Sequence, residues 1–411
     1  MLKYIIRSEI EVDYMDYVFS DKVSGLQASA IREILKYCVF PDIISFAAGN
    51  PAPDAFPTET IKKISDKMLS ENPILALQYN ITEGYTALRD TLKADMQKKG
   101  IFNPEVDELI ITSGAQQANE LAAKVLCNEK DKLVCESPSF IGSLNSFRSY
   151  NVNLIGVPLE NDGMDMDILE SELKKGGVKL IYVIPNFQNP TGLTMSLEKR
   201  KKLYELACKY NTMILEDNPY GDIRFAGENV DTIKSMDKEG RVIYSGTFSK
   251  TLAPGLRVGF SVAPKPVIQK MVVCKQVADV HTNIWAQSVC DNFMKEVDME
   301  EHLNGIREIY RRKCNLMLSE MDKHFSKKVK YTRPEGGLFI WATFPEGTDM
   351  PEFCRKAVAD YKVAVVPGTA FVINENDKSY SFRLNYSTPT DEQIVKGIEI
   401  LGKLTKEMFG E

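Results

Sequence analysis

The sequence predicts an α/β protein, with a mostly parallel sheet covered by helices on both faces and a smaller α+β domain beside it. Two observations support this fold class. Short apolar runs alternate with amphipathic segments through the middle of the chain, and roughly the last hundred residues mix strand and helix patterns without that alternation. A chain of 411 residues has room for both domains.

Five apolar runs are the expected strands of the large sheet. Amphipathic segments separate them: in 196–210 the residues Leu203, Leu206 and Ala207 recur at helical spacing, and 115–127 has the same pattern. This alternation favours parallel strands, because parallel neighbours need a crossover helix between them. The runs are Leu109–Ile111, Leu133–Cys135, Leu180–Ile184, Met213–Leu215 and Val242–Tyr244.

The C-terminal region has patterns for two strands and two helices. Residues 336–344 and 381–387 resemble strands, whereas 352–361 and 391–404 resemble helices. A helix expected over 29–37 would pack with them. The expected division is an N-terminal arm with part of the small domain over 1–55, a large domain over 56–300, and the rest of the small domain over 301–411.

The composition limits the possible functions. A net charge of −6 and a pI near 5.5 argue against nucleic acid and anionic membranes as partners, since both attract basic surfaces. The eight cysteines form no C-x-x-C pair and only three histidines occur, so we expect no metal site. No apolar signal segment begins the chain, and we expect a cytoplasmic protein with reduced cysteines.

Polar side chains follow each apolar run, at the strand ends where ligands bind in parallel α/β sheets. Ordinary turns would account for the asparagines, prolines and glycines there. Turn chemistry gives no reason for Asp217 and Lys250 to finish apolar runs. A desolvated lysine near a cation, here Arg257, loses proton affinity and can form a Schiff base, although a surface lysine on a turn is the common alternative.

A second candidate feature is an anion site at the start of the helix expected over 115–127. The preceding Ser113 and Gly114 would leave main-chain N–H groups facing a phosphate, and Thr247 and Arg257 could complete the site. An ordinary helix cap would give the same local pattern. The sequence lacks a dinucleotide-binding G-x-G-x-x-G after a strand, and 245–251 has the wrong spacing for a P-loop.

The motif F-S-K-T-x-x-P-G-x-R-x-G over 248–259 resembles the lysine motif of pyridoxal-phosphate-dependent aminotransferases of the aspartate aminotransferase fold. The aminoadipate and kynurenine aminotransferases and the catalytic domains of MocR-type regulators form the most similar branch. The resemblance covers nearly the whole chain, through "ISFAAGNPAPDAFP", "LQYNITEGYTALR", "TSGAQQ", "NFQNPTG", "EDNPYGDIRF" and "FRLNYS". It implies the type I fold, with a mostly parallel seven-stranded-type sheet.

The resemblance implies a role for each matching residue. Lys250 would carry pyridoxal 5'-phosphate as a Schiff base and move the substrate proton, and Asp217 would keep the ring nitrogen protonated. Asn189 and Tyr220 would bond the phenolic oxygen, and Phe140 would stack on the ring. The implied catalytic set is Lys250, Asp217 and Tyr220.

The resemblance also implies a phosphate site and a substrate site. Arg383 would bind the substrate α-carboxylate, with Asn189 and Gly49 beside it. Arg32 would meet the distal group of the substrate, although it could equally belong to a solvated helix face. The implied phosphate site comprises Ser113, Gly114, Ala115, Gln116, Thr247, Arg257 and, from a second subunit, Tyr79.

Some matching positions depart from the family pattern, and some could have an ordinary structural role instead. Ala115 stands where Ser or Thr is frequent, and Phe140 where Tyr is common. Asp217 could cap a turn, Arg383 could form a salt bridge on a strand face, and Tyr79 could belong to the core.

The sequence therefore predicts a homodimeric aminotransferase that moves an amino group from an L-amino acid to a 2-oxo acid, with 2-oxoglutarate as the expected acceptor. One alternative is a pyridoxal-phosphate-dependent C–S lyase on the same fold. Another is a non-catalytic effector domain of a MocR-type regulator. Against the second alternative, only about 25 residues precede the helix expected over 29–37, too few for a winged helix.

Overall fold

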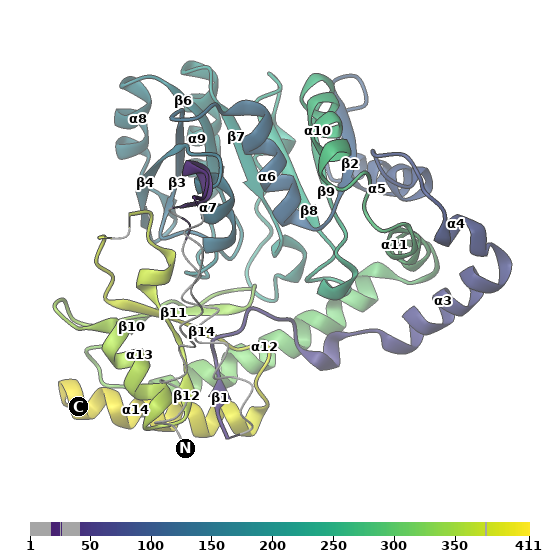
Figure 1. Cartoon of the computed structure of the whole chain (residues 1–411). Helices are drawn as coiled ribbons and strands as arrows, with labels where there is room; N and C mark the ends of the chain where they lie inside the picture. Colours follow the sequence, from purple (N-terminus) through teal and green to yellow (C-terminus); the bar gives the residue numbers. More distant parts are fainter. Residues whose placement is uncertain (1–17, 25, 27–41, 375) are drawn as a thin grey trace.

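The computed structural model describes residues 18–24, 26, 42–374 and 376–411. It has a large α/β part and a smaller part, and the long helix α12 (Met299–His324) runs from one toward the other (Figure 1). The helix expected over 29–37, and Arg32 with it, lie outside the described residues. Within the described ranges, none of the helices has the length and apolar character needed to cross a membrane.

The large sheet has eight strands in the order β2-β9-β8-β7-β6-β3-β4-β5. Strands β4, β3, β6, β7 and β8 are parallel, whereas β9 is antiparallel to both of its neighbours. The prediction of a mostly parallel sheet is confirmed, and the eighth strand, β5, has only two residues. The strands are β2 (Asp107–Thr112), β3 (Lys132–Ser137), β4 (Asn153–Glu160), β5 (Gly163–Met164), β6 (Val178–Val183), β7 (Met213–Asp217), β8 (Val242–Thr247) and β9 (Gly259–Pro264).

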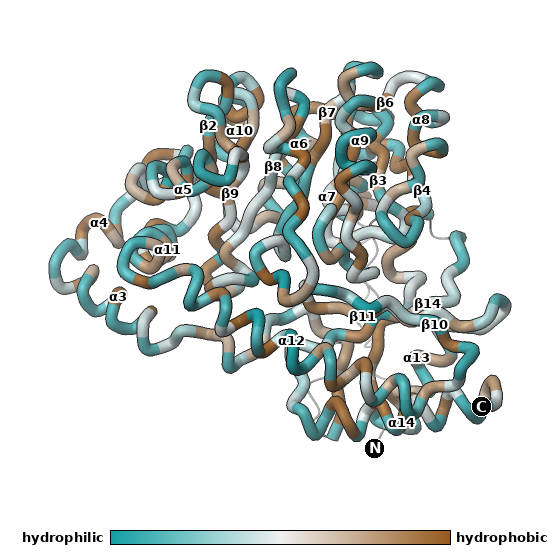
Figure 2. The backbone as a smooth tube through the Cα atoms, turned by 180° about the vertical axis from the view of Figure 1, so that it is seen from behind, coloured by the Kyte–Doolittle hydropathy of each residue, from teal (hydrophilic) through white to brown (hydrophobic). Residues whose placement is uncertain are grey.

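Helices cover both faces of this sheet, which explains the continuous apolar runs. Leu133 and Leu215 pack with Leu121 of α6 on one face, whereas Val134 and Ile214 pack on the other. Figure 2 shows apolar residues along these strands. The described helices that precede α12 in the chain, whether or not they cover the sheet, are α1 (Asp21–Ser24), α3 (Thr58–Glu71), α4 (Pro73–Leu77), α5 (Thr86–Lys98), α6 (Ala115–Leu126), α7 (Ile141–Arg148), α8 (Met166–Lys174), α9 (Leu197–Lys209), α10 (Lys265–Ala278) and α11 (Ile284–Glu296).

The smaller part combines segments from before and after the large sheet. Its main sheet has the order β10-β11-β14-β13, and β1 pairs with β12 in a second, two-stranded sheet. The division at residues 55 and 300 stays a prediction. The elements are β1 (Ile44–Ser45), β10 (Lys330–Tyr331), β11 (Phe339–Thr343), α13 (Met350–Ala359), β12 (Val363–Ala364), β13 (Val366–Pro367), β14 (Ser381–Asn385) and α14 (Asp391–Phe409).

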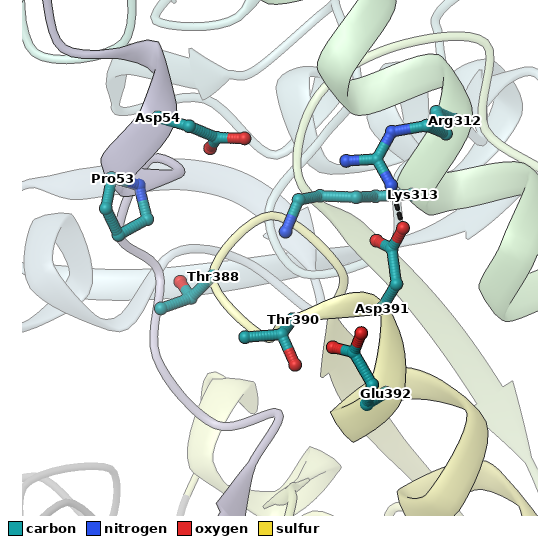
Figure 3. Close-up of a pocket in the computed structure, with 8 residues that line it drawn as sticks. All are labelled: Pro53, Asp54, Arg312, Lys313, Thr388, Thr390, Asp391 and Glu392. Carbon is teal, nitrogen blue, oxygen red and sulfur yellow. Dashed lines mark hydrogen bonds and ion pairs between the residues drawn. The ribbon is translucent and has the colours of Figure 1, made fainter.

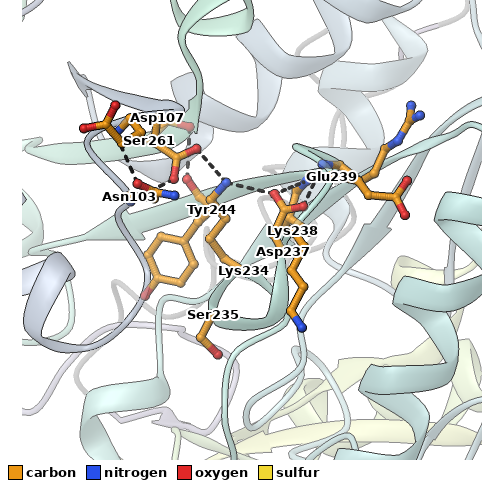
Figure 4. A network of polar contacts seen from close by, with 12 residues as sticks. Asn103, Asp107, Lys234, Ser235, Asp237, Lys238, Glu239, Tyr244 and Ser261 are labelled. Carbon is orange, nitrogen blue, oxygen red and sulfur yellow. Dashed lines mark hydrogen bonds and ion pairs between the residues drawn. The ribbon is translucent and has the colours of Figure 1, made fainter.

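A buried ion network lies at the amino-terminal edge of the large sheet (Figure 4). The Lys234 ammonium is 2.9 Å from a carboxylate oxygen of Asp107, at the start of β2, and 2.9 Å from one of Asp237. Asp237 also accepts hydrogen bonds from the main-chain N–H groups of Arg241 and Val242, where β8 begins. The side chains of Lys234, Asp107 and Asp237 are almost inaccessible to solvent, so the network ties β2 to β8.

We expect Lys234→Met to lower the free energy of unfolding by about 3–5 kcal/mol at neutral pH, because it leaves two buried carboxylates without their cation. Burial alone would raise the pKa of Asp237, but Lys234 and the main-chain bonds hold it below its usual value. That stabilisation is present at neutral pH and is lost as pH falls through the folded-state pKa. The difference in free energy of unfolding between the wild type and Lys234→Met should therefore become smaller at acid pH.

Urea denaturation at several pH values measures this effect. Lys238→Met is the control, because Lys238 is exposed beside the same network. Equal midpoints for Lys234→Met and the wild type at neutral pH would contradict the expectation.

Candidate active site

Asp217 ends strand β7, at the carboxyl edge of the large sheet. Its Oδ2 accepts hydrogen bonds of 2.8 Å from Asn119 Nδ2 and 2.8 Å from Tyr182 OH. Its Oδ1 is buried and has no hydrogen-bond partner among the residues that the structure describes. Burial raises the pKa of Asp217 to about 6, against the effect of the two bonds. Both bonds come from side chains of other elements, which the alternative of a simple turn cap at Asp217 does not account for.

Lys250 follows the neighbouring strand β8. Its Nζ donates a hydrogen bond of 2.9 Å to the carbonyl oxygen of Gly49. Burial and the charges of Arg383 and Arg257 lower the pKa of Lys250 to about 8. The alternative of a solvated turn lysine is therefore wrong, and a substantial fraction of the amine is neutral near physiological pH.

A group of polar donors suited to an anion lies at the start of α6. It comprises the main-chain N–H groups of the first turn after Gly114 and the guanidinium of Arg257, and we call it the cradle. The helix begins after Gly114, whose φ of 78° and missing side chain leave the first-turn N–H groups without a side-chain cap. Arg257 Nη2 donates to the carbonyl oxygen of Ser113 at 3.1 Å. A Cβ atom on Gly114 would lie 2.2 Å from that same nitrogen, so only glycine fits between the helix start and the guanidinium. Thr247 Oγ1 donates to Ser249 Oγ nearby.

Arg383 of β14 is buried, and it is close enough to Lys250 for its charge to lower the pKa of that amine. It donates from Nη1 to Asn189 Oδ1 and from Nη2 to the carbonyl oxygen of Ala47, each at 2.8 Å. Its guanidinium carbon lies 4.2 Å from the centre of the Phe339 ring and 5.0 Å from that of Phe371. Burial lowers the pKa of Arg383 to about 10, and its Nε has no hydrogen-bond partner within the described part of the chain.

Among the described residues no carboxylate pairs with Arg383, so the alternative of a salt bridge on a strand face has no support there. The guanidinium is instead a buried cation that is available to a carboxylate ligand.

Tyr220 and Asn189 lie together beside Arg383. Tyr220 is buried, and its ring meets Phe339 edge-on with centroids 6.1 Å apart. Burial raises the pKa of Tyr220 above its usual value, and the charge of Arg383 and a hydrogen bond with Asn189 oppose that effect. Phe140 directly precedes α7 and is partly buried.

Two predicted phosphate ligands use their side chains elsewhere. Ser113 Oγ donates to Asp279, and Gln116 Nε2 donates to Ser146 Oγ and to the carbonyl oxygen of Gly142. Ser113 and Gln116 can therefore offer an anion only their main-chain N–H groups, of which that of Ser113 already donates to Gln117.

Tyr79 is 80% exposed, and its ring meets His281 edge-on at 5.8 Å. The alternative that Tyr79 belongs to the core is therefore wrong. An exposed tyrosine is compatible with contact across a subunit interface.

The sequence did not reveal Asn119 and Tyr182, the partners of Asp217. Asn119 lies one turn into α6 on an otherwise apolar buried face, and Tyr182 lies inside the apolar run of β6. A buried polar group needs a hydrogen-bond partner, so polar residues at such positions are the signal that could have found them.

A separate hollow of about 330 Å³ lies beside the start of α14 (Figure 3). Lys313 points into it and donates to the carbonyl oxygen of Pro389. None of the predicted site residues that the structure describes lines it. Its lining residues are Pro53, Asp54, Arg312, Lys313, Thr388, Thr390, Asp391 and Glu392.

Two strand ends carry a lysine whose pKa is lowered and a buried carboxylate, and main-chain N–H groups suited to an anion lie next to them. These features define an α/β enzyme that binds a phosphate-bearing carbonyl cofactor. The model of the family "Aminotransferase class I and II" matches residues 41–401. The chain belongs to this family and is an aminotransferase.

Relatives with known names agree. The chain is 41% identical to aromatic-amino-acid aminotransferase 1 of Thermococcus litoralis, over 98% of each protein. The structure of Pyrococcus horikoshii kynurenine aminotransferase superposes with a TM-score of 0.91 at 39% identity, covering 95% of this chain and 97% of that one. The α-aminoadipate aminotransferase of Thermus thermophilus, complexed with N-(5'-phosphopyridoxyl)-L-leucine, gives a TM-score of 0.88 at 37% identity, with coverage of 95% and 97%.

Pyridoxal 5'-phosphate is the cofactor that this family indicates, and the residues present fit it. The unpartnered Oδ1 of Asp217 can accept a bond from a protonated ring nitrogen. The first-turn N–H groups of α6 and Arg257 suit a phosphate dianion. A Cβ atom at Gly114 would fill this cradle.

Proposed function

We propose that this aminotransferase transfers the amino group of an L-amino acid to 2-oxoglutarate, with pyridoxal 5'-phosphate bound covalently at Lys250. The observation that carries the proposal is the arrangement of two buried ionisable groups. Adjacent strands β7 and β8 deliver Asp217 and Lys250 to one edge of the sheet, and the environment raises the pKa of one and lowers that of the other.

The cofactor, when bound, supplies an electron-withdrawing ring that stabilises negative charge at the substrate Cα. Asp217 would keep the ring nitrogen protonated through Oδ1, while Asn119 and Tyr182 fix the carboxylate through Oδ2. A buried anion with two donors on its other oxygen can keep that proton in place during turnover.

Lys250 has two tasks in this proposal. Its amine would hold the cofactor covalently at the carbonyl carbon, with loss of water, and once freed it would accept the proton that leaves the substrate Cα and donate it again. A lowered pKa suits both tasks, because each needs a neutral amine. The carbonyl oxygen of Gly49 orients the Nζ atom.

Arg383 binds the substrate α-carboxylate as a bidentate partner, with Asn189 beside it. The aromatic rings of Phe339 and Phe371 hold the guanidinium plane and exclude water from it. Arg32 as the contact of the distal substrate group stays a prediction.

We also propose a cytoplasmic homodimer in which Tyr79 reaches the phosphate site of the partner subunit. Exposed apolar side chains support the dimer: Ile74, Leu77 and Tyr79 are 70–80% exposed along α4 and the loop after it. All seven cysteines in the described part of the chain are free thiols, which supports a reducing compartment. Sedimentation equilibrium should give twice 46.3 kDa, and a mass of 46.3 kDa would contradict the dimer.

A panel of amino donors tests the proposed reaction. Aromatic, branched and dicarboxylic L-amino acids are each incubated with the holoenzyme and 2-oxoglutarate, and glutamate formation is measured. At least one donor should support turnover that requires the acceptor. Release of pyruvate and ammonia from a cysteine conjugate without acceptor, and no glutamate from any donor, would favour the lyase alternative.

The rate at which the apoprotein captures pyridoxal 5'-phosphate covalently should rise with pH through about 8, because only the neutral Lys250 amine attacks an aldehyde. Arg383→Met should move this midpoint upward, since it removes a cation that lowers the pKa of Lys250. Stopped-flow absorbance measures the rate. Arg333→Met, at an exposed arginine, is the control, and an unchanged or lower midpoint in Arg383→Met would count against the electrostatic coupling.

A further inference from the structure

A fully buried lysine lies behind the phosphate cradle. Lys275 of α10 has no solvent exposure of its side chain, and its Nζ lies 2.8 Å from both carboxylate oxygens of Asp279. The same Nζ donates to Gln117 Oε1 at 2.7 Å. An exposed lysine–aspartate pair at this helical spacing contributes little to stability. Full burial of the ammonium costs far more than that, so the pair needs an explanation beyond helix stability.

The carboxylate of Asp279 joins this lysine to the loop before α6. Asp279 Oδ2 accepts a hydrogen bond of 2.9 Å from Ser113 Oγ and one of 2.8 Å from Gln117 Nε2. Gln117 Oε1 in turn accepts the main-chain N–H of Ser113 at 2.8 Å. Thr282 Oγ1 lies 3.2 Å from Ser113 Oγ and adds a fourth contact to the cluster.

Every polar group of Ser113 is therefore held. Its N–H donates to Gln117, its hydroxyl to Asp279, and its carbonyl accepts from Arg257. The next residue is Gly114, whose left-handed φ turns the chain into α6. The directions of the first-turn N–H groups follow from how Ser113 is fixed.

We propose that Lys275 and Asp279 are positioning residues that set the main-chain N–H groups at the start of α6 for the phosphate of the cofactor. The proposal rests on the proposed function, because it takes pyridoxal 5'-phosphate as the ligand. Neither side chain touches the cradle itself: Asp279 acts through Ser113, and Lys275 keeps Asp279 charged and oriented.

The two forms of the cofactor separate this role from a general loss of structure. Pyridoxal carries the aldehyde and ring but lacks the phosphate, so its affinity reports the Lys250 and Asp217 side of the site only. In Asp279→Asn apoprotein the dissociation constant for pyridoxal 5'-phosphate should rise by about 10- to 100-fold. The dissociation constant for pyridoxal should stay unchanged. The ³¹P resonance of the bound phosphate should shift relative to the wild type.

Asp291→Asn is the matched control. Asp291 forms a lysine–aspartate pair of the same i,i+4 spacing with Lys295 of α11, in which the carboxylate is buried and the lysine half exposed, and the bonds of its carboxylate go to Thr91 and Lys295, not to the loop before α6. It should leave both dissociation constants at wild-type values. Ser113→Ala provides a second variant, and it keeps the buried Lys275–Asp279 pair intact. It should also raise the dissociation constant for pyridoxal 5'-phosphate and leave that for pyridoxal unchanged.

The positioning role would be overturned if Asp279→Asn and Ser113→Ala bound pyridoxal 5'-phosphate and pyridoxal more weakly by the same factor. It would also be overturned if neither dissociation constant changed. The wild type reports separately on the proposed function, which requires that it bind pyridoxal 5'-phosphate far more tightly than pyridoxal. Wild-type protein that binds neither ligand contradicts the function and the positioning role together. If both variants keep the wild-type preference for pyridoxal 5'-phosphate over pyridoxal, the positioning role alone is contradicted.

Discussion

Lys250→Ala should lower the rate of transamination by about 10⁴-fold or more, because one substitution removes both the covalent nucleophile and the proton carrier. The visible absorbance of the lysine-bound cofactor should disappear with it. The fold should survive, since among the described residues the amine donates a single hydrogen bond, to the carbonyl oxygen of Gly49. Steady-state assays and absorbance spectra of the reconstituted protein measure both losses.

Lys270→Ala controls for the loss of a lysine as such, because Lys270 is exposed on α10. It should keep wild-type absorbance and turnover. Full transamination by Lys250→Ala would refute the assignment of the site.

Asp217→Asn should lower kcat by about 10²- to 10³-fold, the cost of removing one preorganised charge interaction from a buried site. Asparagine can still accept from Asn119 and Tyr182, but it lacks the negative charge that keeps the ring nitrogen protonated. Cofactor affinity should change less than kcat, since the phosphate cradle is untouched. Single-turnover rates with an amino acid, alongside cofactor titrations, measure the two effects.

Glu216→Gln is the matched control for Asp217→Asn. Glu216 is the preceding residue of β7, is equally buried, and accepts from the main-chain N–H groups of Ile233 and Lys234 on the far side of the sheet. It should affect stability while turnover of the folded protein stays within about twofold of wild type. Similar losses of kcat in both variants would mean that buried negative charge in general matters, not a charge at the ring nitrogen.

The sheet was predictable because both of its faces are covered, which produces continuous apolar runs that sequence periodicity detects. Strand direction was not predictable in the same way. Gly259–Pro264 forms the antiparallel strand β9, and its composition matches that of a parallel strand. Direction depends on the length and path of the connection, here the short segment 248–258 that carries Lys250.

The site was predictable only in part. Asp217 and Lys250 were detectable because ionisable residues rarely end apolar runs, and the roles of the other positions came from the family resemblance. Asp279 and Lys275 look like an ordinary helix end in the sequence. Their function depends on contacts with Ser113 and Gln117, which lie about 160 positions away, and no local pattern encodes such contacts.

The buried Lys234 network lies at the opposite edge of the sheet from Asp217 and Lys250, and this separation matters for protein engineering. Substitutions that raise heat tolerance by improving packing around the starts of β2 and β8 should leave catalytic rates unaltered, since effects at distant sites add independently. The amino-terminal edge is therefore the place to look for a more robust biocatalyst.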